Sequence, residues 1–390
     1  MAVDSKVFSL EGKGLKLDTA EDLEAHIGPL RGMPGVEEVR VLGNTLGVGA
    51  CKLLGEVLAT KKTLKVANLA DIFTGRLLNE IPEALSYLLT SILNLPNLRT
   101  INLNDNAFGL NTQEPLIAFL ASHLHARKEE ARKSGQEVPD LETVICGRNR
   151  LENGSMMAWA EAFRLHNKVK EIKMVQNGIR QEGISLLLSE GLSHATRLKT
   201  LDLQDNTFTI MGARALAKAV PLWVDILELG IGDSLLSAKG GVLLAEALSK
   251  GQNQKLEILR LQYNDITAPA IKDLFNAAQD ALPSLRRIEL NGNKFSEDDE
   301  SILAFQELLD LRKEEYTGDF VDEDAWGVDS LSDLEELESD EEEEEEEEIT
   351  TEERAEKLIK DAEEAQEEPT VQLKDREVDD LASKLQKTSI

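Results

Sequence analysis

Few residues in this 390-residue sequence have the types and spacing of a self-contained chemical site. The glycine, lysine and serine spacing of a phosphate-binding loop does not occur, nor does an HExxH zinc pattern or a CxxC pair. His123 and His125 are close together, but their charged surroundings favour a solvated loop over a metal site. Cys146 falls among aliphatic residues of a strand-like segment, which favours a core residue over a nucleophile. We therefore expect no metal, no cofactor and no catalytic centre within the chain itself.

Polar residues suited to contacting a partner recur instead just after short aliphatic segments. Asp71 and Arg76 share one such turn, with the sequence DIFTGR. Five others form a candidate docking line on later turns, namely Arg148, Arg150, Gln176, Gln204 and Asp205. An arginine on a turn is usually a solvated surface residue. These residues can act together only if the fold brings the turns to one edge.

A sequence repeat supplies elements that would do this. Its pattern is an aliphatic residue, two spacers, an aliphatic, one spacer, an aliphatic, two spacers and Asn, as in Leu198, Leu201, Leu203 and Asn206. The alternation predicts a short strand, the Asn a turn, and the apolar face of 211–220 a helix. Such units bury their apolar faces only by stacking. The sequence therefore predicts an α/β leucine-rich repeat solenoid, a ribonuclease-inhibitor-like crescent with an inner parallel sheet and outer helices.

The spacing of the repeats is regular except at two steps. The anchor positions are 44, 72, 106, 149, 177, 206, 234, 264 and 293, and most steps are 28 to 30 residues. The step after 72 is 34 residues, which a loop at Asp71–Glu80 absorbs. The step after 106 is 43 residues, and its excess at 124–138 is a charged helical stretch without a strand of its own.

Charge divides the chain into a nearly balanced body and an acidic end. The chain has 43 Lys and Arg against 73 Asp and Glu, a net of -30, and residues 319–390 have 30 acidic against 7 basic residues. We expect an N-terminal cap at 1–35 with an irregular first strand at 7–17, a solenoid at 36–318, and a largely disordered acidic tail at 319–390. The tail is expected either to solubilise the chain or to attract a basic partner surface.

Several classes of protein are disfavoured. The negative charge argues against broad nucleic-acid binding, because phosphates would be repelled. No stretch approaches 18 uninterrupted apolar residues, and the first ten residues lack an apolar signal segment. Two cysteines are too few for a disulfide framework. We therefore expect an intracellular, soluble monomer with no membrane and no nucleic-acid partner.

Several turn segments have sequences more specific than a generic leucine-rich repeat requires. They are DIFTGR at 71–76, DNAFG at 105–109, CGRNRLENGSM at 146–156, KMVQNGIR at 173–180, LDLQDNTFT at 201–209 and ELNGNKFSEDD at 289–299. Together they resemble the Ran GTPase-activating proteins, in the shorter fungal form with an acidic tail, over essentially the whole of 7–390. The resemblance implies an enzyme regulator that accelerates GTP hydrolysis by the GTP form of Ran, alone or with Ran-binding proteins. It would act in the cytoplasm to support nucleocytoplasmic transport.

The resemblance also implies roles for individual residues. This family is understood to act without a classical arginine finger, by holding a glutamine of Ran in place. The DIFTGR arginine is important to activity in the family, which makes Arg76 the candidate for catalysis and Asp71 the next candidate. The docking-line residues are candidates for partner binding. The repeated asparagines are assigned to architecture.

The sequence departs from the family pattern at one place. The family has a complete repeat between the helix at Gln113–Leu120 and the strand at Leu141, and one of its asparagines is thought to help position the glutamine of Ran. Here that unit is missing, in agreement with the 43-residue step. A repeat array tolerates the loss of a unit, but a binding surface does not. We therefore expect a chain that folds but activates Ran poorly.

Two other classes share parts of this pattern. An acidic leucine-rich repeat module that chaperones histones or other basic proteins would account for the tail, but such proteins have shorter repeats. A ribonuclease-inhibitor-like scaffold has the same repeat length, but such proteins are rich in cysteine. Deletion of 319–390 separates the first alternative from an activator, because only the chaperone should lose its partner.

Overall fold

The computed structural model describes residues 6–92, 95–109, 112–120, 133, 135, 141–317 and 325–335. The chain divides into two units, Met1–Glu336 and Leu337–Ile390, and the described residues belong to the first. Almost all of the charged stretch predicted at 124–138, and the tail from residue 336 on, lie outside the described residues.

The first unit is built on a parallel sheet whose strands are mostly three residues long. The central residue of each three-residue strand is buried against the helices, and most of its neighbours are only partly covered, as the alternation predicted. In spatial order the strands are β1 (Val7–Ser9), β3 (Glu38–Arg40), β5 (Val66–Asn68), β6 (Thr100–Asn102), β7 (Thr143–Ile145), β8 (Glu171–Lys173), β9 (Thr200–Asp202), β10 (Glu228–Gly230), β11 (Ile258–Arg260), β12 (Arg287–Glu289) and β13 (Gly327–Val328). A second, two-stranded sheet pairs β2 (Lys16–Leu17) with β4 (Thr45–Leu46).

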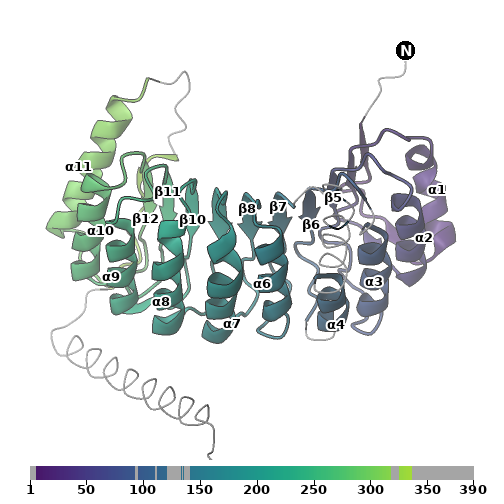
Figure 1. The fold of residues 1–390 in the computed structure, drawn as a ribbon, viewed down its shortest axis with the longest axis horizontal. Helices are drawn as coiled ribbons and strands as arrows, with labels where there is room; N and C mark the ends of the chain where they lie inside the picture. Colours follow the sequence, from purple (N-terminus) through teal and green to yellow (C-terminus); the bar gives the residue numbers. More distant parts are fainter. Residues whose placement is uncertain are drawn as a thin grey trace, which may run out of the picture. The chain divides into compact units, whose positions relative to one another are not determined.

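Helices cover one side of the main sheet (Figure 1). They are α1 (Ala20–Arg31), α2 (Val48–Leu58), α3 (Ile81–Ile92), α4 (Gln113–Ile117), α6 (Met156–Leu165), α7 (Gln181–Leu186), α8 (Thr209–Ala219), α9 (Ser237–Leu248), α10 (Ala268–Asp280) and α11 (Glu300–Glu314), with short helical turns at Leu187–Gly191, Leu192–His194 and Val220–Leu222. Sheet and helices enclose one aliphatic core along the array. The predicted leucine-rich repeat fold is confirmed.

The asparagines of the repeat form a buried hydrogen-bonded ladder. The side-chain amide of Asn106 donates to the carbonyls of Leu103 (2.9 Å) and Leu69 (2.9 Å), in its own repeat and the preceding one. Its backbone N–H donates to Oδ1 of Asn149 in the next repeat (2.9 Å), whose own N–H donates to Oδ1 of Asn177 (2.9 Å). Each asparagine thus satisfies backbone groups that the turn would leave buried and unpaired. This confirms their architectural assignment.

The array is continuous across the 43-residue step. Strand β6 pairs directly with β7, with Ile101 opposite Val144. The ladder bond from Asn106 to Asn149 spans the same step. The two strands are therefore direct neighbours in the sheet, with no described strand between them.

Residues 325–335, which we expected in the tail, pack on the last repeat, and we call them the strap. Strand β13 continues the sheet beside β12. The carboxylate of Asp329 accepts hydrogen bonds from the backbone N–H groups of Leu290 (2.7 Å) and Asn291 (3.1 Å). The Tyr263 hydroxyl donates to Asp333 (2.7 Å), and the N–H of Glu335 donates to the carbonyl of Asn293 (3.0 Å). The ordered array therefore extends past residue 318.

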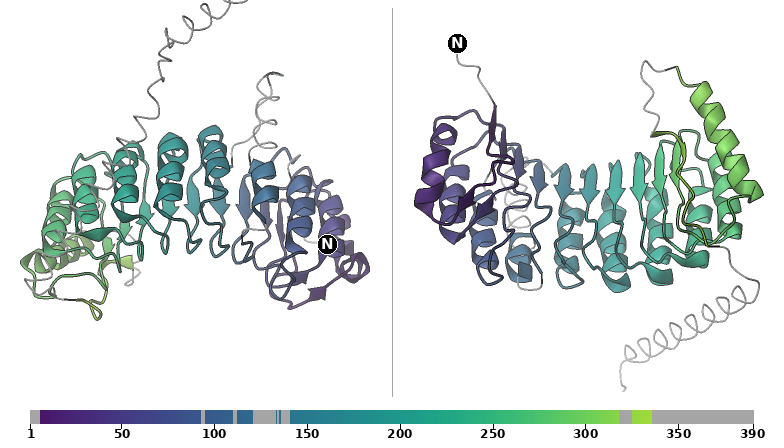
Figure 2. Two further views of the ribbon diagram at one scale, coloured as in Figure 1. Left: turned by 90° about the horizontal axis from the view of Figure 1, so that it is seen from below. Right: turned by 180° about the vertical axis from the view of Figure 1, so that it is seen from behind.

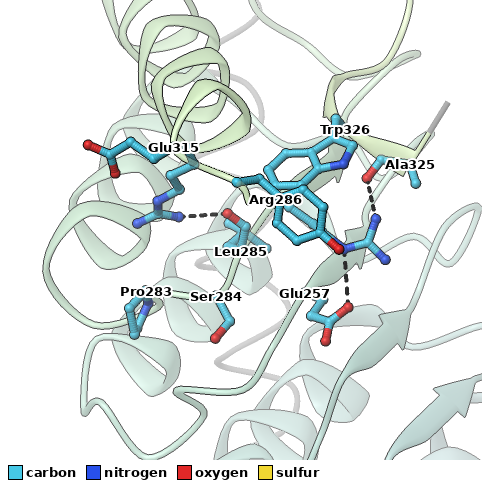
Figure 3. A pocket seen from close by; sticks show the side chains of 10 residues that line it. Glu257, Pro283, Ser284, Leu285, Arg286, Glu315, Ala325 and Trp326 are labelled. Atoms are coloured by element: carbon cyan, nitrogen blue, oxygen red, sulfur yellow. Dashed lines mark hydrogen bonds and ion pairs between the residues drawn. The ribbon is translucent and has the colours of Figure 1, made fainter. Parts of the chain in front are cut away.

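A cavity of about 580 Å³ lies where the strap meets α11 (Figure 3). The guanidinium of Arg286 donates to Glu257 (3.1 Å) and to the carbonyl of Ala325 (2.7 Å), and it lies 5.9 Å from the Trp326 ring centre. These contacts fasten the start of the strap to the edge of the sheet.

Candidate functional site

The turns that follow the strands share one strained backbone position. The residue before each ladder position has a positive φ, with values of 53° at Arg148, 53° at Gln176 and 55° at Asp205. Its N–H donates to a carbonyl of the next repeat, as from Arg148 to Val175 (2.8 Å). Non-glycine residues adopt this conformation rarely, and here the inter-repeat hydrogen bond holds it. Because the strands are parallel, these turns lie along one edge of the sheet (Figure 2).

Three of the predicted docking residues lie at consecutive copies of this position. Arg148, Gln176 and Asp205 come from the turns after β7, β8 and β9. Arg150, also with a positive φ of 53°, lies two residues further along the first of these turns and is exposed. The structure therefore brings these four residues onto neighbouring turns, as the spacing predicted.

Asp105 on the preceding turn is a member of this line that the sequence analysis missed. Arg148 donates to both oxygens of its carboxylate, with a 2.9 Å bond from Nη2 to Oδ2. This contact lowers the pKa of Asp105 and raises that of Arg148. Asp105 stands at the position before the ladder Asn106, and that position in the DNAFG segment was the signal that could have identified it.

Gln204, unlike the other four docking residues, does not have a positive φ, and its side chain is hydrogen-bonded to two others. Its Nε2 donates to Asp202 (2.9 Å), and its Oε1 accepts from Nε2 of Gln262 (2.6 Å) two strands away. The residues between them on β10 and its turn are Gly230 and Gly232, and a Cβ at Gly232 would lie 2.5 Å from the amide of Gln262. Gln204 is therefore held in a polar bridge across the uncovered face of the sheet.

Asp205 and Asp233 place two carboxylates on adjacent turns. Burial and the negative charge of Asp233 raise the pKa of Asp205, and a hydrogen bond from Gln176 acts in the opposite direction. No lysine or arginine of the described residues forms an ion pair with either carboxylate within 4 Å. The line thus changes from the Arg148–Asp105 pair at one end to net negative charge at the other.

Arg76 is directed away from solvent, and only 10% of its side chain is exposed. Its Nη2 forms an ion pair with Asp18, in the segment between β2 and α1, and donates to the carbonyl of Thr45 (3.4 Å). Its Nη1 lies 4.0 Å from Glu80. The ion pair lowers the pKa of Asp18. A Cβ at Gly47 would collide with the Asp18 carbonyl, so this corner is closely packed.

Arg76, which was predicted to carry catalysis, is held by contacts within the chain and does not extend from the surface toward a partner. Asp18, with which Arg76 forms its ion pair, is 58 residues earlier in the sequence, and no local pattern indicated this pairing.

The segment 71–80 around this arginine, the Arg76 loop, is fixed at several points. The Thr74 hydroxyl donates to Asp71 (2.5 Å), and the N–H of Arg76 donates to the carbonyl of Phe73 (3.0 Å) across a turn with Gly75 at φ 79°. The Phe73 ring is buried and lies 6.3 Å from that of Phe108. Asp71 thus braces the loop from within, at a φ of 45°.

Other reactive groups in the described residues are buried or isolated. Burial raises the pKa of the Cys146 thiol to about 12 and that of Cys51 further. No group of three or more His, Cys, Asp or Glu side chains is arranged to hold a metal ion in the part of the chain that the structure describes. Among the same residues, no helix is long and apolar enough to cross a bilayer.

Comparison with known proteins identifies relatives of the chain. The family model described as Leucine Rich repeat matches residues 252–275, which include β11. Ran GTPase-activating protein 1 of Saccharomyces cerevisiae is 34% identical over 342 residues, covering 79% of this chain and 83% of that protein. Ran GTPase-activating protein 1 of Xenopus laevis is 38% identical over 198 residues, 44% of this chain and 34% of that protein. The ribonuclease inhibitor of Sus scrofa is 28% identical over 303 residues, 77% of this chain and 60% of that protein.

Some of these alignments are longer than the part of this chain that they cover. The yeast alignment runs over 342 residues, but 79% of this 390-residue chain is about 308, so about 34 positions have no counterpart here. The same calculation gives about 26 alignment positions without a counterpart in this chain for the Xenopus protein, and about 3 for the ribonuclease inhibitor. The excess in the two Ran GTPase-activating proteins is about the length of one repeat. With the yeast protein matched over most of both lengths, this chain belongs to the Ran GTPase-activating protein family.

Proposed function

We propose that this chain is a GTPase-activating protein for Ran, a regulator that stimulates hydrolysis of GTP by Ran. The observation that carries the proposal is the 34% identity to the yeast Ran GTPase-activating protein over 83% of its length. Activators of this kind raise hydrolysis by about 10³ to 10⁵ by positioning water and stabilising charge in the partner's active site. The partner is the GTP form of Ran, alone or with Ran-binding proteins. The chain acts as a monomer in the cytoplasm, in support of nucleocytoplasmic transport.

The docking line is proposed as the surface that Ran contacts. Arg148, Arg150, Gln176 and Asp205 are on neighbouring turns at one edge, so one partner can reach them together. The backbones of Arg148, Gln176 and Asp205 are held by inter-repeat hydrogen bonds, which reduces the entropy lost when a partner binds. Gln204 contributes through its bridge to Gln262, beside this edge.

Arg76 is proposed to act as a positioning residue. Its ion pair with Asp18 fastens the Arg76 loop to the N-terminal cap, and Asp71 holds the loop through Thr74. Displacement of a group by about 1 Å can cost about 100-fold in rate. Loss of Arg76 would therefore reduce activation through the geometry of the loop.

The lost unit is proposed to weaken activation. The step of 43 residues and the alignment excess of about one repeat both support a missing unit. The continuous ladder from Asn106 to Asn149 explains how the array folds without it. Its absence brings the Arg76 loop one repeat closer to the docking line, which changes the surface offered to Ran.

Single-turnover hydrolysis of GTP by Ran tests these statements. The chain would be compared with Arg76→Ala and with a variant carrying one more repeat between Leu120 and Leu141. We expect weak stimulation by the chain, less by Arg76→Ala, and strong stimulation by the extended variant. Failure of both the chain and the extended variant to stimulate Ran would refute the proposed function.

The histone-chaperone alternative is not favoured by the relatives, which are Ran GTPase-activating proteins in several organisms. Deletion of 337–390 provides the corresponding check, because an activator should retain its core activity without this segment.

A further inference from the structure

Two adjacent leucines of the Arg76 loop are largely exposed. Leu77 is 64% exposed and Leu78 is 62% exposed, immediately after the arginine. Single exposed apolar residues are common on protein surfaces. These two differ because they are consecutive and belong to the loop that lengthens its repeat to 34 residues.

The loop holds the two leucines in a fixed place. On one side, Arg76 is paired with Asp18, and buried Phe73 anchors the preceding turn. On the other side, the N–H of Glu80 donates to the carbonyl of Leu77 (3.0 Å), and α3 begins at Ile81. Apolar side chains on a braced loop lose little backbone freedom when they are covered, so they suit a binding contact.

The glutamate run near the end of the chain is a poor cover for them. Residues 341–348 are eight consecutive glutamates, whose charges would lose hydration against leucine side chains. A stable contact between two copies needs about 800 Å² on each partner, far more than two leucine side chains provide. The occupant must therefore be a protein that is already bound through a larger neighbouring surface.

The docking line is such a surface. The Arg76 loop follows β5, and the docking turns follow β7 to β9 of the same parallel sheet, so both lie at one edge. Asp105, which pairs with Arg148, is on the turn of the repeat that follows the loop. A partner that spans the turns after β7 to β9 therefore reaches the Arg76 loop by extending across one more repeat.

We infer that Leu77 and Leu78 are an apolar anchor that binds an exposed apolar patch on the GTPase, next to the polar area held by the docking line. This inference rests on the proposed function. Burying the exposed two thirds of each leucine corresponds to about 10-fold in affinity. The double substitution Leu77→Ala/Leu78→Ala should weaken binding by up to about 100-fold.

The test measures the dissociation constant of the full chain for Ran loaded with a slowly hydrolysed GTP analogue. The two single alanine variants and their double are compared with Leu77→Met/Leu78→Met, which preserves apolar volume and should bind within about 3-fold of the parent. Leu311→Ala is the matched control, because Leu311 is 53% exposed on α11, far along the chain from the loop. Thermal unfolding should be unchanged in all of them, since these side chains are exposed.

The outcomes separate this inference from the proposed function. Loss of affinity in the alanine variants, with recovery in the methionine variant, supports the anchor. If the parent binds Ran and the double alanine variant binds equally well, the anchor is wrong while the activator proposal stands. If the parent binds but does not stimulate hydrolysis, and the alanine variants lose binding, the anchor holds and the activation proposal fails. A parent that does not bind Ran overturns both.

Discussion

Replacing Asn149 by alanine tests whether the array is continuous across the long step. The Asn149 side chain is fully buried, and its Oδ1 is the acceptor for the backbone N–H of Asn106 (2.9 Å). Its Nδ2 donates to the carbonyls of Leu103 (2.9 Å) and Gly147 (3.0 Å). The substitution would remove these three bonds, together with a weaker one from Nδ2 to Sγ of Cys146 (3.3 Å), at the junction of β6 and β7.

The expected cost follows from which groups lose their partners. The Asn106 N–H becomes a buried donor without an acceptor, at about 1–3 kcal/mol. The Leu103 carbonyl still accepts from the Asn106 side chain, and the Gly147 carbonyl still accepts from the N–H of Asp105. Their losses are therefore only those of ordinary bonds, about 0.5–1.5 kcal/mol each. We expect a total destabilisation of about 4 kcal/mol, the sum of the middle values of these ranges.

Urea unfolding measures this cost, and two variants calibrate it. Asn177→Ala removes the equivalent ladder residue after an ordinary 28-residue step and should cost about the same. Asn97→Ala removes an exposed amide that donates to the carbonyl of Lys62 (2.8 Å), and it should cost less than about 1 kcal/mol. A cost for Asn149→Ala near that of Asn97→Ala, with Asn177→Ala still at about 4 kcal/mol, would show that the ladder is interrupted at the step.

Three further predictions concern the edge of the sheet. Asp18→Asn removes the carboxylate that holds Arg76, so stimulation of Ran should fall toward that of Arg76→Ala, and single-turnover hydrolysis would show no loss if the ion pair were unimportant. Arg148→Ala and Asp105→Ala should affect Ran binding less than additively when combined, because the two side chains pair, and a double-mutant cycle with additive losses would contradict this. Asp205→Asn should raise stability at pH 7 but not at pH 3. The raised pKa means that the folded state disfavours the charged carboxylate, so this penalty appears as pH rises through that pKa, and equal effects at both pH values in urea unfolding would exclude it.

The sequence predicted the parts of this protein that repeat. Alternation at Leu201 and Leu203 predicted a short strand, which the structure places at Thr200–Asp202, and the spacing of Asn206 predicted a turn residue that satisfies backbone groups. Both depend on contacts within one unit or with its neighbour, which recur with the period of the pattern. The same regularity placed Arg148, Gln176 and Asp205 on neighbouring turns.

What the sequence could not predict depends on contacts that occur once. The pairing of Arg76 with Asp18 joins a turn to the N-terminal cap across 58 residues, and no periodic signal reports it. The bridge from Gln262 to Gln204 passes over Gly230 and Gly232. The sequence alone does not show that these glycines leave room for it. The strap has an acidic composition, so Asp329 and Asp333 were assigned to the tail although each accepts hydrogen bonds from the last repeats.

The strap also has a consequence for association between chains. In the inner repeats, the N–H after a strand finds its acceptor in the next strand, as Leu261 does in the carbonyl of Glu289 (2.8 Å). At the end of the array, Asp329 and β13 take that place. An uncovered edge at β12 would offer unpaired backbone groups to the strands of other molecules. The strap therefore covers the edge of β12 and opposes end-to-end polymerisation of chains. Its negative charges add repulsion between chain ends.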